Sequence, residues 1–545
     1  MWLIHTDTLK LQQVTEAERV PYAILSHTWE EEEVSFQDFR DLNNALKKKG
    51  FGKIWETCQI ASSRGLRYAW VDTCCIDKSS SAELSEAINS MFRWYQESDV
   101  CVVFLSDLNP SQEPDVDFPR QFPKSRWLTR GFTLQELIAP PIVSFYDRSW
   151  NYRGTKLGWR SLISETTKID PSVLEDPQGL FLVPVGRRMS WAAKRNTTRV
   201  EDLAYCLLGI FDVNMPLLYG EGPKAFTRLQ EEIAKQTCDL SLFAWRQDGL
   251  DPPYRGILAQ SPAEFAHCGA LKHKVRDAYL TNEYTFTNKG LRIETALITF
   301  PSVTQNFVWN LGCSERDDWS KLEIQGYLGV FLAKTAIGYV RAEPNVLFEA
   351  GTQRRGPNEA GTFYMKAHLN KLEYARIGRR FEGGVYVRHP DTVRITATAP
   401  GALWDQSRSL FLNQGQGINA YVRLGFRERL GLKDQTAAVI IACSTMERPV
   451  CTIWEKRNPM FSRAQGFMKS KVLADYVAAD YLRLRMIGNQ GSNAVTSKAV
   501  AHIEDPSSAK TISVQVELQE HVFEGQRGFV LNIEISQATG TLPRR

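Results

Sequence analysis

The chain has 545 residues, of which 66 are basic and 62 acidic, so its formal net charge is +4. This length predicts more than one domain, because a single hydrophobic core seldom serves so many residues. Hydrophobic residues make up 43% of the chain, a content that excludes a largely disordered protein. The near balance of charges argues against nucleic acid as a partner, since proteins that bind phosphate backbones carry a clear basic excess.

The N-terminus and the hydropathy of the chain give no sign of secretion or membrane insertion. Residues 1–7 lack the basic and apolar regions of a signal peptide, and no window contains the roughly 18 apolar residues of a spanning helix. We therefore expect no membrane span and a cytoplasmic location. The ten cysteines, several of which lie in apolar runs, are expected to be reduced core thiols.

Residues 1–150 alternate short apolar runs with helical patterns. The apolar runs predict four buried strands, at residues 22–26, 68–72, 100–106 and 142–147. The helical patterns lie between them, at residues 36–49, 53–64, 80–95 and 129–138. Ser80 and Glu83 have the spacing of a capping box at the start of the third helix. Strands alternating with helices predict an α/β domain with a parallel, doubly wound sheet.

The rest of the chain divides by its hydrophobic pattern into two further regions. Residues 151–245 form a helical extension, in which Thr198 and Glu201 have the spacing of a second capping box and another helix is expected at residues 223–236. Residues 246–545 alternate apolar and polar positions between turn residues, which predicts an antiparallel, β-rich and sandwich-like domain. Its clearest runs are residues 284–287, 291–294, 327–332, 384–387, 439–442 and 528–535.

The carboxyl ends of parallel strands meet at one edge of a sheet, so residues that follow each strand converge there. We predict at this edge a crevice of the kind that binds nucleotides. The side chains expected to line it follow the first three strands or lie on the next helix: Ser26, His27, Trp29, Asp72, Asp77, Ser106, Trp127, Arg130, Phe132 and Glu136. No phosphate-binding P-loop and no dinucleotide-binding glycine motif occurs in the chain.

Glu136 is the candidate catalytic residue of this set. It lies in the apolar sequence of residues 132–139, where Phe132 precedes it by one helical turn and would shield the carboxylate from water. Such burial raises the pKa of a carboxyl, which suits acid–base chemistry or the stabilisation of an oxocarbenium ion. The alternative is a structural carboxylate that pairs with Arg126 or Arg130.

Other residues of the set also have structural alternatives. His27 follows Ser26, but no nucleophile motif surrounds the pair, so His27 contacts either the ligand or the edge of the sheet. Asp72 and Asp77 fit ribose hydrogen-bond acceptors and loop caps equally well. The adjacent cysteines at residues 74–75 lack the spacing of a metal site, so no metal is expected.

Three ordered blocks of the first domain resemble the signature blocks of the fungal heterokaryon incompatibility (HET) domain. They read YAILSHTW at residues 22–29, YAWVDTCCIDK at residues 68–78, and SRW at residues 125–127 with RGFTLQELIAP at residues 130–140. Farther along, the chain resembles the extension that follows this domain in vegetative incompatibility proteins, at residues 189–193, 199–211 and 216–222. The resemblance covers residues 1–245.

The resemblance implies a role in non-self recognition, in which fusion of incompatible fungal cells triggers programmed cell death and the HET domain is the toxic effector. HET domains are distantly similar to TIR domains, which implies a TIR-like or flavodoxin-like fold. Some TIR domains hydrolyse NAD with a glutamate in a Trp-x-x-x-Glu pattern, and the matching positions here are Phe132 and Glu136. NAD is thus the implied substrate and no cofactor is implied, although phenylalanine lacks the indole donor of the pattern.

These observations lead to three hypotheses. In the first, Glu136 stabilises the ribosyl cation as nicotinamide leaves NAD, while Phe132 and Trp29 pack on the rings and Asp72 holds the ribose. In the second, the α/β domain is a non-enzymatic module that self-associates as a homo-oligomer and recruits an incompatibility partner, whose identity the sequence leaves unknown. The third assigns to residues 246–545 the role of a lectin-like or peptide-binding sensor that restrains the effector.

Overall fold

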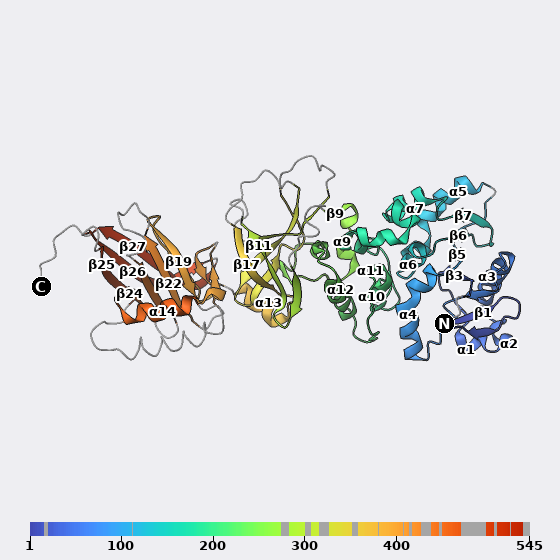
Figure 1. Ribbon diagram of the computed structural model, residues 1–545, viewed down its shortest axis with the longest axis horizontal. Coiled ribbons are helices and arrows are strands. Elements are labelled where there is room, and N and C mark those ends of the chain that lie inside the picture. Colours follow the sequence, from blue (N-terminus) through green and yellow to red (C-terminus); the bar gives the residue numbers. More distant parts are fainter. Residues whose placement is uncertain are drawn as a thin grey trace.

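The parts of the computed structural model follow one another along the long axis of the molecule (Figure 1). An N-terminal α/β and helical part is followed by a central β region and then by a C-terminal β region. The structure describes residues 1–15, 20–111, 113–273, 283–299, 307–315, 326–350, 358–379, 381–406, 408–413, 417–426, 438–445, 449–469, 497–505, 510–523 and 525–537. Within these ranges, no helix has the length and apolar character needed to cross a membrane.

A seven-stranded sheet forms the centre of the N-terminal part. Its order is β2 (Leu11–Gln13), β1 (Trp2–His5), β4 (Tyr68–Trp70), β3 (Tyr22–His27), β5 (Val100–Phe104), β6 (Val143–Tyr146) and β7 (Tyr152–Thr155). The central strands β4, β3, β5 and β6 run parallel, which confirms the four predicted strands and the α/β class. Strands β1, β2 and β7 add antiparallel edges, which the pattern did not predict because they are short and only partly buried.

Helices connect the parallel strands. They are α1 (Phe36–Phe39), α2 (Leu42–Ala45), α3 (Phe51–Ser63), α4 (Ser81–Gln96), α5 (Pro114–Gln121) and α6 (Thr133–Ile138). The single helix predicted at residues 36–49 is wrong, because the Asp41 side chain caps a second short helix. Ser80 caps α4 as predicted, but the Glu83 carboxylate accepts a hydrogen bond from the backbone of Asp77 instead of closing a capping box.

A helical region packs against helices α4 and α6 of the α/β part. It comprises α7 (Arg160–Thr167), α8 (Pro171–Glu175), α9 (Val185–Ser190), α10 (Asp202–Tyr205), α11 (Leu208–Phe211) and α12 (Lys224–Gln236). The second predicted capping box is wrong, because the Glu201 carboxylate accepts from the backbone N–H groups of Gly220 and Gly222. Gly209 allows α11 to approach α4, since a Cβ at this position would collide with the Cβ of Phe92.

One hydrophobic core runs through the α/β sheet, the helical region and the central β region, from Leu3 to Met365. The central sheet contains β8 (Tyr254–Arg255), β10 (Tyr284–Thr287), β11 (Gly290–Ile298), β12 (Phe307–Asn310), β14 (Leu328–Thr335), β15 (Gly338–Ala342), β16 (Phe348–Glu349) and β17 (Asn358–Met365), and α13 (Lys371–Gly378) follows it. Arg341 on β15 is buried and donates to the backbone oxygens of Phe243 and Trp245. These bonds join the central sheet to the end of the helical region.

Two sheets that enclose a second hydrophobic core form the C-terminal part. The first contains β20 (Trp404–Asp405), β21 (Leu410–Phe411), β18 (Val385–Arg388), β27 (Gln526–Gln537), β26 (Lys510–Phe523) and β25 (Lys498–Asp505). The second contains β19 (Val393–Ala399), β22 (Asn419–Phe426), β23 (Ala438–Ser444) and β24 (Val450–Glu455). Their shared core includes Val385 and Leu531 of the first sheet and Val422 and Ile441 of the second. A helix, α14 (Pro459–Lys469), packs on the second sheet.

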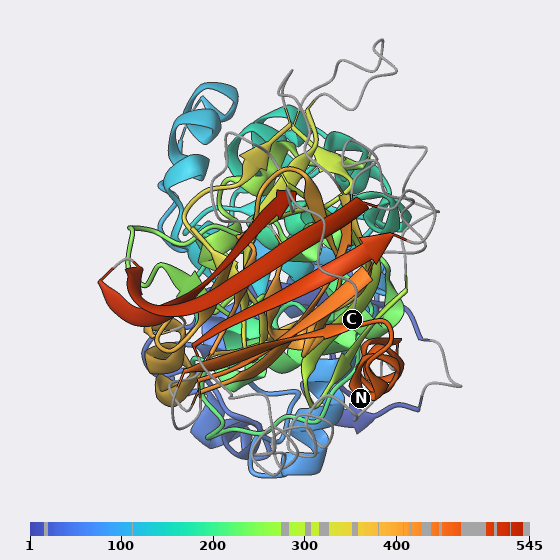
Figure 2. The same cartoon turned by 90° about the vertical axis from the view of Figure 1, so that its left-hand side faces the viewer.

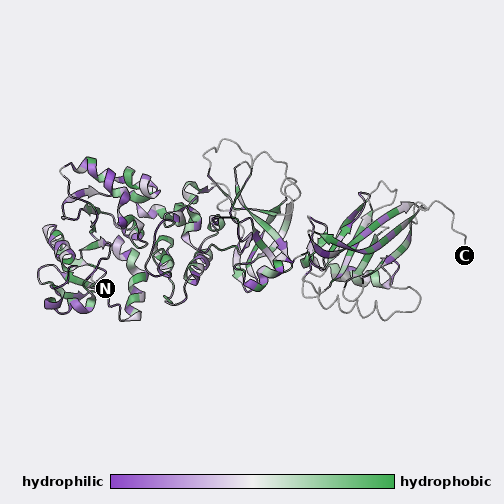
Figure 3. Ribbon diagram, turned by 180° about the vertical axis from the view of Figure 1, so that it is seen from behind, coloured by the Kyte–Doolittle hydropathy of each residue, from purple (hydrophilic) through white to green (hydrophobic). Residues whose placement is uncertain are grey.

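The long strands of this sandwich have the alternation on which the prediction of a β-rich region rested. Figure 2 looks onto the sandwich, with β25, β26 and β27 (red) in front of the second sheet (orange). Hydrophobic and hydrophilic residues alternate along these strands (Figure 3), and Val514, Val516 and Leu518 of β26 contribute to the shared core. The expected β-rich C-terminal region is therefore confirmed.

Candidate functional site

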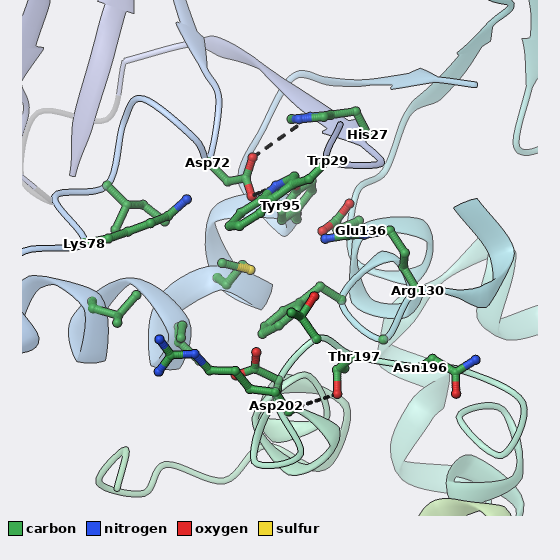
Figure 4. Close-up of a pocket in the computed structure, with 18 of the residues that line it drawn as sticks. His27, Trp29, Asp72, Lys78, Tyr95, Arg130, Glu136, Asn196, Thr197 and Asp202 are labelled. Carbon is green, nitrogen blue, oxygen red and sulfur yellow. Dashed lines mark hydrogen bonds and ion pairs between the residues drawn. The ribbon is translucent and has the colours of Figure 1, made fainter. Parts of the chain in front are cut away.

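A cavity of about 540 Å³ lies at the carboxyl ends of β3 and β4. Strand β3 lies between β4 and β5, so the connections that follow β3 and β4 lead to opposite sides of β3. Open α/β sheets bind their ligands at such a reversal of strand order. The sheet edge supplies one wall of the cavity, with His27, Trp29 and Asp72, and residues 196–202 of the helical region supply the other (Figure 4). The fold therefore places a cavity at the edge that the sequence predicted.

The second wall is held in place by backbone contacts next to Gly131. Asn196 donates its N–H to the backbone oxygen of Thr129 at 2.6 Å and accepts from the N–H of Gly131 at 3.0 Å. Arg130 is extended because it pairs with Asn196, so the helix predicted at residues 129–138 begins only at Thr133. A Cβ on Gly131 would lie 2.6 Å from Cγ2 of Thr197. Glycine thus permits the close approach that completes the cavity.

Glu136 on α6 borders the cavity and is 7% exposed. Its Oε2 accepts a hydrogen bond from Oγ of Ser26 at 2.5 Å. Burial raises the pKa of Glu136 to about 8, against the opposing effects of the Ser26 hydrogen bond and the Arg130 and Arg195 charges. Among the described residues no cation pairs with Glu136, and Arg126 pairs instead with Glu30 at 3.1 Å. The carboxyl is thus buried, largely protonated at neutral pH and open to the cavity.

A polar and aromatic cluster from the ends of β3 and β4 and the segments that follow them also lines the cavity. Nε1 of Trp29 donates to Oδ2 of Asp72 at 2.8 Å, and Nζ of Lys78 lies 3.8 Å from the centre of the Trp29 ring. Nδ1 of His27 lies 4.0 Å from Oδ1 of Asp72, too far for a hydrogen bond. Burial lowers the pKa of His27, so its imidazole is neutral at pH 7. Among the described residues, neither His27 nitrogen nor Oδ1 of Asp72 has a hydrogen-bond partner, which leaves polar capacity for a ligand.

The wall from the helical region adds residues that the sequence reasoning missed. Tyr219 donates its hydroxyl proton to Oδ1 of Asp202 at 2.9 Å, and the Arg199 guanidinium carbon lies 4.5 Å from the centre of the Tyr219 ring. Burial raises the pKa of Asp202. The polar run at residues 196–199 was the available signal. It was overlooked because the sheet-edge rule gathers only residues that follow the strands.

The ten predicted site residues divide into two groups. Those that line the cavity are His27, Trp29, Asp72, Arg130, Phe132 and Glu136.

The other four predicted site residues do not line the cavity. Ser26 and Trp127 are fully buried behind Glu136, and Nε1 of Trp127 donates to Oγ of Ser26. Ser106 lies beside Thr28 and accepts from Arg126, outside the cavity. Asp77 accepts from the backbone and hydroxyl of Ser79, which matches the loop-capping alternative.

The combination of groups defines what this cavity suits chemically. Lys78, Arg130 and Arg199 are cations that can neutralise an anionic ligand, and Trp29 and Phe132 offer aromatic faces to a planar ring. Within the described ranges, no three His, Cys, Asp or Glu residues lie close enough together to hold a metal ion. The cavity thus joins an acid with a shifted pKa to groups suited to a nucleotide-like ligand.

The part of the chain that contains the sheet edge matches a known protein family. The family model described as "Heterokaryon incompatibility protein (HET)" matches residues 22–154, and a domain of unknown function, DUF8212, matches residues 224–255. "Vegetative incompatibility protein HET-E-1" of Podospora anserina is 48% identical over 222 residues, which are 39% of this chain and 16% of that protein. This chain therefore spans less than a fifth of the relative's length in the match.

No solved structure matches the chain significantly. The HET match includes every predicted site residue and ends before residues 196–202, which complete the cavity. The signature blocks, the family match and the relative agree. Residues 22–154 therefore form a heterokaryon incompatibility (HET) domain.

Proposed function

We propose that this protein is a cytoplasmic heterokaryon incompatibility effector whose HET domain hydrolyses NAD in the cavity around Glu136 and so triggers cell death on non-self recognition. The family and the named relative support the incompatibility role. The observation that carries the chemistry is the Glu136 carboxyl, buried without an ion pair among the described residues and bordering a cavity of about 540 Å³. The parallel strand order β4, β3, β5, β6 supports a flavodoxin-like, and by extension TIR-like, domain.

The proposed reaction breaks the bond between C1′ of the ribose and the ring nitrogen of nicotinamide. The bonding electron pair leaves with neutral nicotinamide, a water oxygen bonds to C1′, and that water releases one proton. Glu136 in its carboxylate form stabilises the positive charge that develops on the ribose. Trp29 and Phe132 pack against the rings, and the free Oδ1 of Asp72 accepts a ribose hydroxyl.

The raised pKa of Glu136 gives this proposal a pH signature. In the free protein the carboxyl is mostly protonated below its pKa of about 8. The cationic nicotinamide ring favours the carboxylate, so binding of NAD should release a proton. We expect kcat/KM to rise about tenfold per pH unit below the pKa of Glu136 and to level off above it.

The direct test is the release of nicotinamide from NAD by the purified full-length chain, measured by chromatography over a range of protein concentrations. Glu136→Gln keeps the size of the side chain and removes its charge, so we expect turnover to fall by at least about 100-fold. Glu86→Gln on the exposed face of α4 is the matched control and should retain full turnover. No turnover by wild type, or equal turnover by Glu136→Gln, would reject the proposal.

An exposed apolar groove favours a second candidate function, a non-enzymatic module that self-associates. The groove is lined by Leu42, Leu46, Phe51 and Trp55, and Leu46 is 56% exposed. Exposed apolar patches of this kind mark interaction surfaces. Sedimentation of the wild type and of Leu46→Glu tests this function: a concentration-dependent oligomer that Leu46→Glu abolishes supports it, and a monomer at every concentration rejects it.

The C-terminal sandwich is proposed as the sensor that restrains the effector. Its core is separate from the core that ends at Met365, which places a suitable truncation after Gly378 rather than within the shared core at Trp245. Expression of residues 1–378 in fungal cells should be more toxic than expression of the full chain. Equal toxicity at equal protein levels would remove the restraining role.

A further inference from the structure

Ser26 lies between two buried side chains, one of them the carboxyl of the proposed reaction. Nε1 of Trp127 is 2.8 Å from Oγ of Ser26, and Oγ of Ser26 is 2.5 Å from Oε2 of Glu136. Ser26 and Trp127 are fully buried, so water does not compete for these hydrogen bonds. The three side chains come from β3, from the turn before α6 and from α6 itself.

The chemistry of the groups sets the direction of this chain. An indole N–H only donates, so Ser26 must accept from Trp127. The serine hydroxyl has a single proton, and among the described residues Oε2 of Glu136 is the acceptor that lies within its reach, so Ser26 donates to Oε2. Oε2 therefore acts as an acceptor in both protonation states of Glu136. A proton on this carboxyl must sit on Oε1, which has no hydrogen-bond partner among the described residues.

We propose that Trp127 and Ser26 are positioning residues that keep Oε2 of Glu136 unprotonated and confine the titrating proton to Oε1. Ser26 thus supports Glu136 from behind and does not bind substrate, contrary to the role expected from sequence. The catalytic meaning rests on the proposed function, because an oriented carboxylate is what the developing ribosyl cation requires. The hydrogen-bond direction itself does not depend on any substrate.

The donor from Ser26 has a defined effect on the acidity of Glu136. Burial favours the neutral carboxyl, while a hydrogen bond donated to the charged form favours the carboxylate. Other groups around this carboxyl also act on its charge. Asp72 raises the pKa, Arg130 and Arg195 lower it, and the neutral Tyr95, Cys101 and Cys206 also face it. Removing the serine hydroxyl while these groups remain should isolate its contribution.

The test is an infrared titration of the full-length chain, in which the protonated-carboxyl band of Glu136 is identified by subtraction of Glu136→Gln. Ser26→Ala removes the donor, so we expect the pKa of Glu136 to rise by about one or more. Trp127→Phe removes the donor that polarises the serine hydroxyl, which weakens the hydrogen bond from Ser26 to Glu136 and should raise the pKa of Glu136 by a smaller amount. Ser144→Ala removes a buried hydroxyl on β6 that contacts Arg64 and should leave the pKa unchanged.

Ser26→Cys provides a second variant, in which a side chain of nearly the same size is a weaker donor. The pKa of Glu136 in this variant should fall between its values in the wild type and in Ser26→Ala. Ser26→Cys and Trp127→Phe keep the test intact if Ser26→Ala does not fold. An unchanged or lowered pKa in the folded variants would overturn the inference.

The infrared result can be separated from the fate of the proposed reaction. A pKa shift without NAD cleavage rejects the reaction and leaves the inference standing. NAD cleavage whose pH midpoint does not move in Ser26→Ala or Ser26→Cys rejects the inference and leaves the reaction standing.

Discussion

The α/β and helical part differs from the C-terminal sandwich in one buried carboxyl group. The sandwich core consists of apolar residues such as Val422 and Ile441, and its buried carboxylate, Asp405, has Arg408 within 3.8 Å. The α/β and helical part buries Glu136 without an ion pair among the described residues. Burying a charge is costly unless it is paired or hydrogen-bonded. The burial of Glu136 without an ion pair therefore indicates that the α/β and helical part contains a carboxyl group whose role is not packing.

Two buried cations of the α/β and helical part have more than one hydrogen-bond partner each, in contrast to Glu136. Lys156 donates to the backbone oxygens of Ile138 and Pro140, and Arg195 donates to the backbone oxygen of Arg130. These cations satisfy carbonyl groups at the ends of short elements, so they have a structural use. Among the described residues, Ser26 alone donates a hydrogen bond to the Glu136 carboxyl, which otherwise borders the cavity.

The largest expected effect comes from placing a charge in the sandwich. Ile441→Glu puts an unpaired carboxylate at a fully buried position of β23 and should destabilise the sandwich by more than about 4 kcal/mol. Urea denaturation monitored by circular dichroism measures the loss. Val500→Glu, at an exposed position of β25, is the control and should have little effect. An Ile441→Glu protein as stable as wild type would remove the contrast between the two parts.

The next effect is a pH-dependent gain of stability in Glu136→Gln. Folding raises the pKa of Glu136 from 4.5 to about 8, so the folded state binds the proton more tightly than the unfolded state. Wild type therefore loses stability as the pH rises from about 4.5 to about 8, whereas the glutamine variant does not. We expect the advantage of Glu136→Gln to grow by about 4 kcal/mol between pH 5 and pH 9.

Urea denaturation of both proteins at several pH values checks this prediction. Glu86→Gln is again the control, because this side chain is exposed on α4 and lies outside the cavity. A constant difference between wild type and Glu136→Gln across the pH range would contradict the buried, neutral carboxyl.

A smaller effect is expected where the two walls of the cavity meet. Gly131→Ala introduces a Cβ against Thr197 and Cys206, which should cost about 2 kcal/mol and displace residues 196–202. Gly52→Ala is the matched control, because nothing lies within 4 Å of its added Cβ on α3 and helix propensity favours alanine. We expect Gly131→Ala to lower the thermal midpoint and Gly52→Ala to raise it. Equal changes in the two variants would show that the walls are not closely packed.

The smallest effect concerns ligand binding by the helical wall. Arg199→Gln removes a cation of the cavity and should raise KM for NAD by about tenfold, or about 1.4 kcal/mol, with little change in kcat. Arg93→Gln on the exposed side of α4 is the control. A change in kcat alone would show that Arg199 acts on the reaction rather than on binding.

Some elements were predictable from the sequence because their signal is local. Strands β3 and β5 are buried along their whole length and therefore appear as continuous apolar runs. Helix α12 has one apolar face and was predicted almost residue for residue. The single helix expected at residues 36–49 and the capping box expected at Thr198 and Glu201 were wrong, because Asp41 caps a second helix and Glu201 bonds to a distant loop.

The sequence by itself determined the parallel strands, the edge at which they end and the family of the N-terminal domain. Each depends on residues close together in the chain or on ordered blocks. Only the tertiary structure decided that residues 196–202 close the cavity and that Glu136 accepts from Ser26 rather than from an arginine. The acidity of a carboxyl depends on which side chains exclude water from it and which donate to it. For Glu136 these lie as far apart in the chain as Ser26 and Arg195.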